Sequence, residues 1–260
     1  MTYGAAQPVM VSSRDNPLLK ELRKTAHDNV AYRKAGRFWI EGDHLCSAAL
    51  ARGVKPAIAV FSESFWPLAP AGYAQEAIKS IVVPDALFAE LSGLESPAKV
   101  GFVLDLPVDT ALQPHAATVI LDRVQDAGNV GSILRSAGAF GFRQVVALKG
   151  TAALWSPKVL RAGMGAHFGL HLIEGVELSA LDALAVPIVV TSSHQGEPVQ
   201  NLKLPQPSCA WAMGHEGQGV SADLFARAKF FARIGQPGGE ESLNVAAAAA
   251  ICLHASSIQG

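Results

Sequence analysis

Charged residues, cysteines and long apolar runs are all scarce in this chain. Of its 260 residues, 17% are charged and 50% are hydrophobic, a balance that excludes an intrinsically disordered protein or a coiled coil. The longest apolar candidate, residues 245–254, is half as long as the roughly 20 residues that a membrane-spanning helix needs. Residues 1–10 lack the basic stretch and apolar run of a signal peptide. We therefore expect a cytoplasmic globular protein with no membrane partner.

Metal-binding and nucleophile motifs are also missing. The cysteines Cys46, Cys209 and Cys252 are far apart and form no C-x-x-C pair, whereas a structural zinc site needs about four clustered ligands. None of the eight histidines belongs to an H-E-x-x-H motif, and no G-x-S-x-G motif is present. We expect no metal ion, and a reducing compartment in which the cysteines stay unpaired.

The net charge of −1 conceals an asymmetry along the chain. Residues 1–55 contain nine Lys and Arg against five acidic residues, a net charge of +4, and residues 56–260 contain 12 against 17, a net charge of −5. A patch of +4 is often no more than a solvated face. If the protein does bind a polyanion, we expect the contact to be concentrated near the N-terminus.

Short apolar strands alternate with helical segments in two successive blocks, which predicts an α/β protein with two domains. Asp15-Asn16-Pro17 is a typical helix start, and residues 1–105 form the first block. Residues 106–116 contain two prolines and little periodicity, as in a linker. Residues 117–260 form the second block, for which we expect a mainly parallel sheet covered on both faces. Its ligand site should lie beyond the carboxyl ends of the strands.

Three glycine-rich segments follow predicted strands of the second block. Residues 121–137 join a strand to a helix whose first turns carry Asn129 and Arg135. Residues 213–221 place three glycines within six residues, and residues 234–246 lead into a run of alanines. Glycine lets a backbone pass close to a ligand, and the start of a helix can hold an anion. Each segment could therefore belong to a binding site.

Each segment also has a purely structural interpretation. Asn129 could simply cap a helix while Arg135 lies on its surface, and Ser221 and Ser242 could be N-caps as well. Glu216, which lies among the glycines of residues 213–221, argues against a pyrophosphate loop, because a phosphate site avoids a carboxylate whereas a ribose or an amino group accepts one.

Taken in order, these segments resemble the SpoU (TrmH-like) branch of the SPOUT RNA methyltransferases. The similarity lies in GNVGSILRSAGAFGF (128–142), MGHEGQGVS (213–221) and IGQPGGEESLNVAAAAAI (234–251). RFWIEG (37–42) is similar to a segment of the family's small N-terminal substrate-binding domain, which itself resembles a ribosomal RNA-binding protein. The resemblance thus extends over nearly the whole chain.

The resemblance implies a fold and an activity. It implies a C-terminal SPOUT α/β domain with a trefoil knot, preceded by the small α/β RNA-binding domain. It implies that S-adenosylmethionine binds in the knot, that the protein is a homodimer, and that a ribose 2′-hydroxyl of ribosomal or transfer RNA is methylated. General rules of chain connection would not predict a knot.

The family's functional residues can be assigned position by position. The catalytic motif positions correspond to Asn129, Arg135, Glu216, Ser242 and Asn244. The positions implied to contact the cofactor are Thr191, Gly214, Ile234 and Leu243. The chain departs from the family pattern at Ala127, where proline is common, and at Ala246, where serine is common. Neither departure removes a side chain with an implied catalytic role.

The chemistry requires alignment of the sulfonium methyl with the ribose oxygen, and help with loss of the proton. Because arginine stays protonated in proteins, we expect Arg135 to bind the adjoining phosphate and to stabilise the developing alkoxide. Asn129, Glu216 and Asn244 would orient Arg135 and the ribose. RNA phosphates would be bound by the basic residues Lys20, Arg23, Lys24, Arg33, Lys34 and Arg37.

Two alternatives stay open at this point. A catalytically inactive RNA-binding or ribosome-assembly protein of the same fold is one, although Asn129, Arg135 and Asn244 are all present. A nicotinamide-dependent oxidoreductase is the other, although it needs a G-x-G-x-x-G turn and a following acid that we do not find. The target nucleotide and the final proton acceptor do not follow from the sequence.

Overall fold

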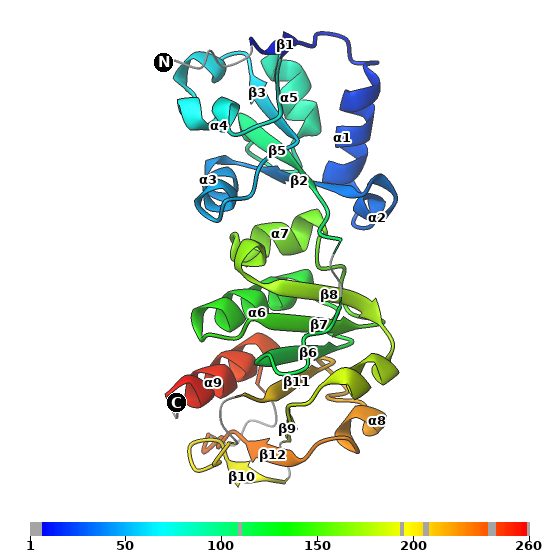
Figure 1. Ribbon diagram of the computed structural model, residues 1–260, viewed down its shortest axis with the longest axis vertical. Helices are drawn as coiled ribbons and strands as arrows, with labels where there is room; N and C mark the ends of the chain where they lie inside the picture. Colours follow the sequence, from blue (N-terminus) through cyan, green and yellow to red (C-terminus); the bar gives the residue numbers. More distant parts are fainter. Residues whose placement is uncertain (1–6, 109–110, 193–194, 205–207, 239–242, 259–260) are drawn as a thin grey trace. The chain divides into compact units, whose positions relative to one another are not determined.

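The computed structural model describes residues 7–108, 111–192, 195–204, 208–238 and 243–258. Its chain contacts define two compact units, one of Met1–Val108 with Trp155–Phe168, the other of Asp109–Leu154 with Gly169–Gly260. Each unit is a sheet with packed helices, so the α/β class expected from the sequence is confirmed (Figure 1). The segment Trp155–Phe168, which the sequence pattern places inside the second domain, clusters with the first unit.

The first unit is built on a mixed five-stranded sheet of order β1-β4-β3-β5-β2. Strand β5 is antiparallel to β2 and β3, and the other pairs are parallel. Its elements are β1 (Val9–Met10), α1 (Pro17–His27), α2 (Ala31–Ala35), β2 (Arg37–Glu41), α3 (Asp43–Ala51), β3 (Ile58–Ser62), η1 (Trp66–Leu68), α4 (Ala71–Gln75), β4 (Lys79–Val83), α5 (Asp85–Leu91), β5 (Val100–Asp105) and α7 (Pro157–Gly163), with η2 (Ala166–Gly169) at its boundary.

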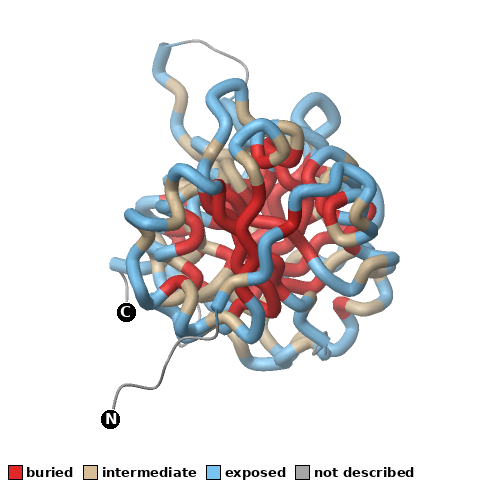
Figure 2. Tube along the Cα trace, turned by 90° about the horizontal axis from the view of Figure 1, so that it is seen from above, coloured by how far each residue is buried: buried red, intermediate tan, exposed pale blue. Residues whose placement is uncertain are grey.

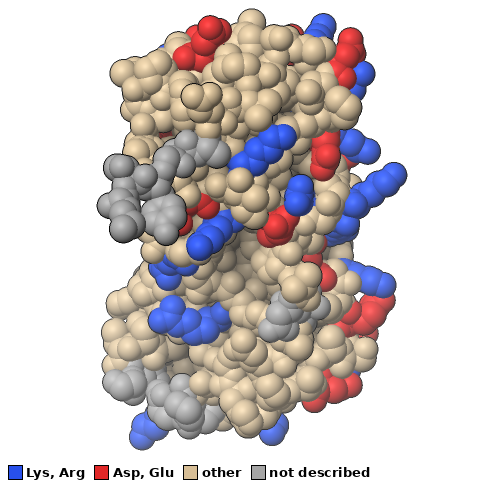
Figure 3. Space-filling model, turned by 45° about the horizontal axis from the view of Figure 1, so that its top comes forward, with Lys and Arg blue, Asp and Glu red and all other residues tan. Residues whose placement is uncertain are grey.

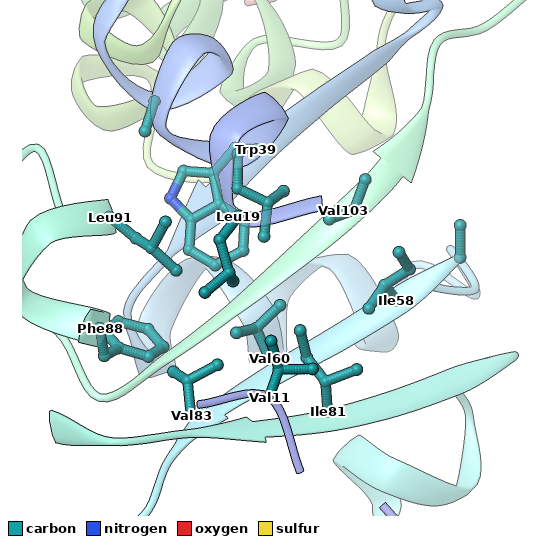
Figure 4. Close-up of a cluster of buried hydrophobic side chains, with 13 residues drawn as sticks. Val11, Leu19, Trp39, Ile58, Val60, Ile81, Val83, Phe88, Leu91 and Val103 are labelled. Carbon is teal, nitrogen blue, oxygen red and sulfur yellow. The ribbon is translucent and has the colours of Figure 1, made fainter. Parts of the chain in front are cut away.

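Helix α1 begins where the sequence predicts. The Asn16 side chain accepts a hydrogen bond from the backbone N–H of Leu18, and Pro17 occupies the first turn. The buried face of the helix carries Leu19 and Leu22, which pack with Trp39 of β2 in one apolar cluster (Figure 4). This cluster fixes α1 on the sheet, so the polar side chains of α1 are left at the surface.

The second unit is built on a seven-stranded sheet of order β10-β12-β9-β11-β6-β7-β8, in which every pair is parallel. Its elements are β6 (Thr118–Asp122), α6 (Ala127–Ala139), β7 (Gln144–Leu148), β8 (His171–Val176), η3 (Leu178–Ala183), β9 (Ile188–Thr191), β10 (Glu197–Pro198), β11 (Ala210–Gly214), α8 (Ala222–Phe225), β12 (Phe230–Arg233) and α9 (Val245–Ser257). Strands β6, β7 and β11 are buried along their whole length, and buried positions lie at the centre of the trace (Figure 2).

Both faces of this sheet are covered, as expected of a parallel sheet. On one face, Ile120 and Val190 pack with Leu181 of η3 and Leu224 of α8. On the other, α9 packs against α6 and β11, and the buried Trp211 donates its indole N–H to the Ser256 hydroxyl at 2.8 Å. The helix that closes the chain is therefore anchored on the central strands.

The cysteines are unpaired and buried in the structure. Burial raises the pKa of Cys209 to about 11 and that of Cys252 to about 12, so these thiols are unsuited to nucleophilic catalysis at neutral pH. Across the described ranges, no helix has the length and apolar character needed to cross a bilayer.

Candidate functional site: a cavity at the carboxyl ends of the central strands

Four neighbouring strands of the second unit, β6, β11, β9 and β12, end at the same edge of the sheet because they run parallel. In register, Gly214 at the end of β11 pairs with Asp122 at the end of β6. The segments that follow β9, β11 and β12, together with the start of α9, line an open cavity of about 450 Å³. This volume lies within the range of roughly 300–1,000 Å³ that small-molecule sites occupy.

The structure brings the four predicted cofactor residues together. Thr191 at the end of β9, Gly214 at the end of β11, Ile234 after β12 and Leu243 before α9 all line this cavity. The residues come from four segments that lie up to 52 positions apart in the sequence. Their common placement is the observation on which the functional proposal rests.

One wall of the cavity is the segment 214–221, which we call the cofactor loop. A pair of backbone hydrogen bonds between His215 and Gly219 closes it, at 3.0 and 2.8 Å. The His215 Nδ1 atom accepts the backbone N–H groups of Gly217 and Gln218. A Cβ atom on Gly214 would lie 2.2 Å from backbone atoms of Gly219 and Val220. Glycine is therefore required at the base of this tight loop.

Three predicted catalytic residues form a chain of hydrogen bonds across the three motif segments. Asn244 donates its Nδ2 to Asn129 Oδ1 at 2.9 Å, and Asn129 donates its own Nδ2 to Glu216 Oε1 at 3.2 Å. Asn244 also caps α9, since its Oδ1 accepts from the backbone of Ala246 and Ala247. The chain ties the starts of α6 and α9 to the cofactor loop.

The Glu216 carboxylate accepts hydrogen bonds from the segment before α6 and from the first turn of that helix. Partial burial would raise its pKa, but hydrogen bonds from the Asp126 N–H, the Asn129 amide and the Gln125 N–H hold the pKa below its ordinary value. The group is thus an anion at neutral pH, suited to accept hydrogen bonds and not to donate a proton.

The cap of α6 differs from the sequence interpretation. Its N-cap is Asp126, whose Oδ1 accepts the backbone N–H of Asn129 at 2.7 Å, and the helix begins at Ala127. Asn129 therefore does not cap the helix. With the capping role taken by Asp126, the Asn129 side chain is available for Glu216 and Asn244.

Arg135 is not part of this hydrogen-bond chain. It lies six residues after Asn129, about 120° around the helix axis, and is exposed. Within the described part of the chain, no hydrogen bond or ion pair engages its guanidinium group, and it does not line the cavity. Ser242, the fifth predicted catalytic residue, lies outside the described residues.

The sequence interpretation missed several residues that line the cavity, among them Gln218 and Gln236. The Oε1 atom of Gln236 is buried and has no hydrogen-bond partner among the described residues. A buried carbonyl oxygen without a partner is costly, so a ligand with an amino donor would suit this wall. No sequence signal singles out Gln236, because glutamine is common in loops.

The six basic residues predicted to bind RNA differ in their surroundings. Lys20 pairs with Asp15, Arg23 lies near Glu90, and Arg37 pairs with Asp105 at 2.7 Å. Arg33 donates to the neighbouring Tyr32 hydroxyl. Lys24 and Lys34 are exposed, and no ion pair involves them within the described ranges. In Figure 3, acidic side chains lie beside several Lys and Arg side chains on the face that the view displays.

A metal site finds no support. Although His167 and His171 are four positions apart, no group of three or more His, Cys, Asp or Glu side chains in the described residues is arranged to hold an ion. This observation covers only the part of the chain that the structure describes.

Comparisons with known proteins match both halves of the chain. The family model described as SpoU rRNA Methylase matches residues 116–254, and the MRM3-like substrate binding domain matches residues 16–101. The 23S rRNA (guanosine(2553)-2'-O)-methyltransferase RlmP of Bacillus subtilis (strain 168) is 31% identical over 249 residues, which cover 94% of this chain and 97% of that protein.

Solved structures agree with these matches. An rRNA methyltransferase from Sinorhizobium meliloti superposes with a TM-score of 0.83 at 25% identity, and the match covers 96% of this chain and 98% of that one. The SpoU methyltransferase AviRb from Streptomyces viridochromogenes, in complex with AdoMet, has a TM-score of 0.79 at 25% identity, with 94% and 98% covered.

Proposed function

The chain belongs to the SpoU rRNA methylase family, and on this premise we propose that it transfers the methyl group of S-adenosylmethionine to a ribose 2′-hydroxyl of ribosomal or transfer RNA. The observation that carries the proposal is the cavity that Thr191, Gly214, Ile234 and Leu243 line together. RlmP, which is similar to this chain over almost its full length, is by name a 23S rRNA (guanosine(2553)-2'-O)-methyltransferase. AviRb, a structural relative, holds this cofactor.

The residues present fit S-adenosylmethionine. The cavity combines the backbone of Gly214 with the apolar side chains of Ile234 and Leu243, as a site for an adenosine moiety requires. The Gln236 oxygen, which has no partner among the described residues, offers an acceptor to an amino group. The cofactor, when bound, supplies an electrophilic methyl group.

The residues of the chain would then position and polarise the substrate. Glu216, Asn129 and Asn244 hold the cofactor loop and the two helix starts in one arrangement. The exposed Arg135 guanidinium would bind the phosphate beside the target ribose and stabilise negative charge on the 2′-oxygen as its proton leaves. Ser242 would act beside Asn244, as its motif position implies.

We propose that the enzyme is a homodimer. The exposed positions of α6, Gly128, Ser132, Arg135 and Ala139, recur along one stripe, and small residues there allow close approach of another backbone. On the neighbouring α9, Ile251 is 40% exposed, and Ile258, which directly follows the end of this helix, is 68% exposed. A second copy that contacts the small residues of α6 and covers α9, while it leaves Arg135 open to RNA, would bury Ile251 and Ile258. Sedimentation equilibrium should give the mass of two chains.

The remaining expectations are proposals of the same kind. Ile234 and Gln236 after β12 line the same cavity as the cofactor loop, and the trefoil knot is proposed from the family membership. Residues 1–105 would bind substrate and residues 117–260 would carry out catalysis, joined by residues 106–116. The matched substrate-binding model supports the first assignment. The buried, unpaired cysteines suit the proposed cytoplasmic location.

The proposal is tested with the purified chain, ribosomal and transfer RNA, and S-adenosylmethionine carrying a deuterated methyl group. Mass spectrometry of the nucleosides should find the label in 2′-O-methylnucleosides. Label on a base would overturn the assignment of the acceptor. Binding of RNA and cofactor without any transfer would favour the inactive RNA-binding protein instead.

The Gly214→Ala variant should lose cofactor affinity. The added Cβ would lie 2.2 Å from backbone atoms of the cofactor loop, which cannot swing aside as a side chain can. We expect the Kd for S-adenosylmethionine to rise by about tenfold or more in calorimetric titration. The control is Gly217→Ala in the same loop, since a Cβ there meets no atom closer than 3.9 Å. Equal affinities of the two variants would contradict the geometry.

Removal of Lys24 and Lys34, which form no ion pair among the described residues, should weaken RNA binding more than removal of paired basic residues. Lys24→Ala with Lys34→Ala should lower RNA affinity and reduce the slope of log affinity against log salt by about two, one per phosphate contact. Lys20→Ala with Arg37→Ala serves as the matched control, because these two groups are already partly neutralised by Asp15 and Asp105. An unchanged slope for the first pair would exclude it from the RNA-binding surface.

A further inference from the structure

Arg123, the residue that follows β6, has a backbone conformation that arginine rarely adopts. Its φ is 61°, in the left-handed region, and Met164 is the other non-glycine residue with positive φ within the described ranges. A side chain in this region is strained, and such strain persists where the surroundings impose it. Glycine would occupy the position without strain.

The neighbouring turn holds Arg123 in this conformation. The Arg123 N–H donates to the Thr151 hydroxyl at 3.1 Å, and that hydroxyl donates to the carbonyl of Leu121 at 3.0 Å. Gly150 leaves room for the side chain, since a Cβ atom there would lie 3.1 Å from Arg123 Cγ. The turn after β7 therefore accommodates the arginine.

The Arg123 side chain reaches the cofactor loop. Its Nη1 donates to the Oε1 of Gln218 at 2.9 Å, and its Nε donates to the Oδ1 of Asp122 at 3.1 Å. Asp122 is 2% exposed, and its other oxygen accepts the backbone N–H of Ser221 at 2.6 Å. The guanidinium and the carboxylate thus hold the loop at two points, Gln218 and Ser221.

We propose that Arg123 is a positioning residue that holds the cofactor loop in its binding conformation. Gln218 lines the cavity, so the tie from Arg123 fixes one wall of the site. The buried Asp122 carboxylate supports this contact, because it neutralises the guanidinium and anchors the end of the loop. Arg123 controls the affinity and the release rate of the cofactor and does not touch the reacting atoms. The inference rests on the proposed function in one respect, namely that the cavity holds S-adenosylmethionine.

The strain itself provides a discriminating variant. Arg123→Gly relieves the strain of the left-handed backbone conformation and at the same time removes the hydrogen bond to Gln218. If the side chain were only a structural filler, this variant would fold at least as well and bind cofactor like the wild type. If Arg123 positions the loop, cofactor affinity falls while folding stability changes little, because relief of the backbone strain and loss of the ion pair with the buried Asp122 act on stability in opposite directions.

The experiment compares Arg123→Gly, Gln218→Ala, their double variant and Met164→Gly with the wild type. We expect Arg123→Gly to change the Tm little. It should increase the Kd and the release rate of S-adenosylmethionine about tenfold, and it should leave kcat at saturating cofactor within about twofold. Gln218→Ala should act in the same direction, and the double variant should bind no worse than Arg123→Gly, because both remove one interaction. Met164→Gly removes the same kind of strain elsewhere and should leave the Kd unchanged.

A readout independent of the cofactor separates this proposal from the proposed function. Amide exchange at Gly217, Gln218 and Ser221 should be faster in Arg123→Gly than in the wild type, whether or not S-adenosylmethionine binds. Failure of the wild type to bind the cofactor would count against the proposed function. The exchange result would still decide whether Arg123 holds the loop through Gln218. Wild-type affinity and wild-type exchange in Arg123→Gly, or additive effects in the double variant, would overturn the proposal.

Discussion

Arg135→Ala is expected to abolish methyl transfer while it leaves cofactor binding nearly intact. The guanidinium group is exposed, does not line the cavity, and has no hydrogen-bond or ion-pair partner among the described residues. Its removal therefore breaks no contact that holds the cofactor loop. Loss of a group that stabilises developing negative charge costs about 10²–10³-fold in rate. Single-turnover methylation should therefore fall by at least that factor, while the calorimetric Kd for S-adenosylmethionine stays within about twofold of the wild type.

Arg143→Ala is the matched control for this prediction. Arg143 is also an exposed arginine of the second unit, and it lies just before β7. Its removal should leave the rate unchanged. Wild-type turnover in Arg135→Ala would remove Arg135 from the catalytic residues, and a loss of cofactor binding equal to the loss of rate would assign it a structural role.

Asn129→Asp is expected to have the second largest effect. The substitution preserves shape, but it replaces the Nδ2 donor to Glu216 with an oxygen and brings two carboxylates together. Helix α6 itself should tolerate an acidic residue, because Asn129 lies in its first turn, where negative charge is favourable. We expect the Kd for S-adenosylmethionine to rise by about ten- to a hundredfold with little change in Tm.

The pH dependence of this variant has a definite sign. In the wild type the pKa of Glu216 is lowered, so its stabilising contacts are complete above the ordinary value of 4.5 and are lost only as pH falls through the lowered pKa. Between pH 8 and 5 the wild type should show no change from this group. In Asn129→Asp, protonation of one carboxylate relieves the repulsion, so affinity should improve as pH falls through the same interval.

A second substitution should rescue the first. Glu216→Gln combined with Asn129→Asp restores a donor and an acceptor between the two positions. The new amide keeps one oxygen for the backbone N–H of Gln125, but its NH2 group replaces the oxygen that accepts from the Asp126 N–H. The double variant should therefore regain part of the lost cofactor affinity and lose the pH dependence. If it binds no better than Asn129→Asp alone, the contact between Asn129 and Glu216 is not what organises the site.

Those parts of the fold and site that depend on local chemistry could be predicted from the sequence. Asn16 and Pro17 start α1 as expected, because a capping side chain and a fixed φ act within one turn. The glycine-rich segments at strand ends could be placed at one edge of the sheet, since parallel strands end on the same side. Thr191, Gly214, Ile234 and Leu243 line one cavity, and their contact with the cofactor stays a prediction.

The parts that depend on tertiary contacts could not be predicted. Strand β8 (His171–Val176) contains Glu174 and Gly175, which obscure its apolar pattern, and it is defined by pairing with β7. Helix α6 is capped by Asp126 and not by Asn129, because the Asn129 side chain donates a hydrogen bond to Glu216, which lies 87 positions later in the sequence. The ties from Arg123 to Gln218 span 95 positions and have no motif. The placement of Trp155–Phe168 with the first unit likewise depends on contacts that the periodicity does not encode.

The central claim, methylation of a ribose 2′-hydroxyl by this chain, is tested most directly in cells. Ribose methylation in ribosomal and transfer RNA is mapped by mass spectrometry in cells that lack the protein, and in the same cells supplied with the wild type or with Arg135→Ala. We predict that one or more 2′-O-methylnucleosides are absent without the protein, return with the wild type and stay absent with Arg135→Ala. An identical methylation map in all three would contradict the account.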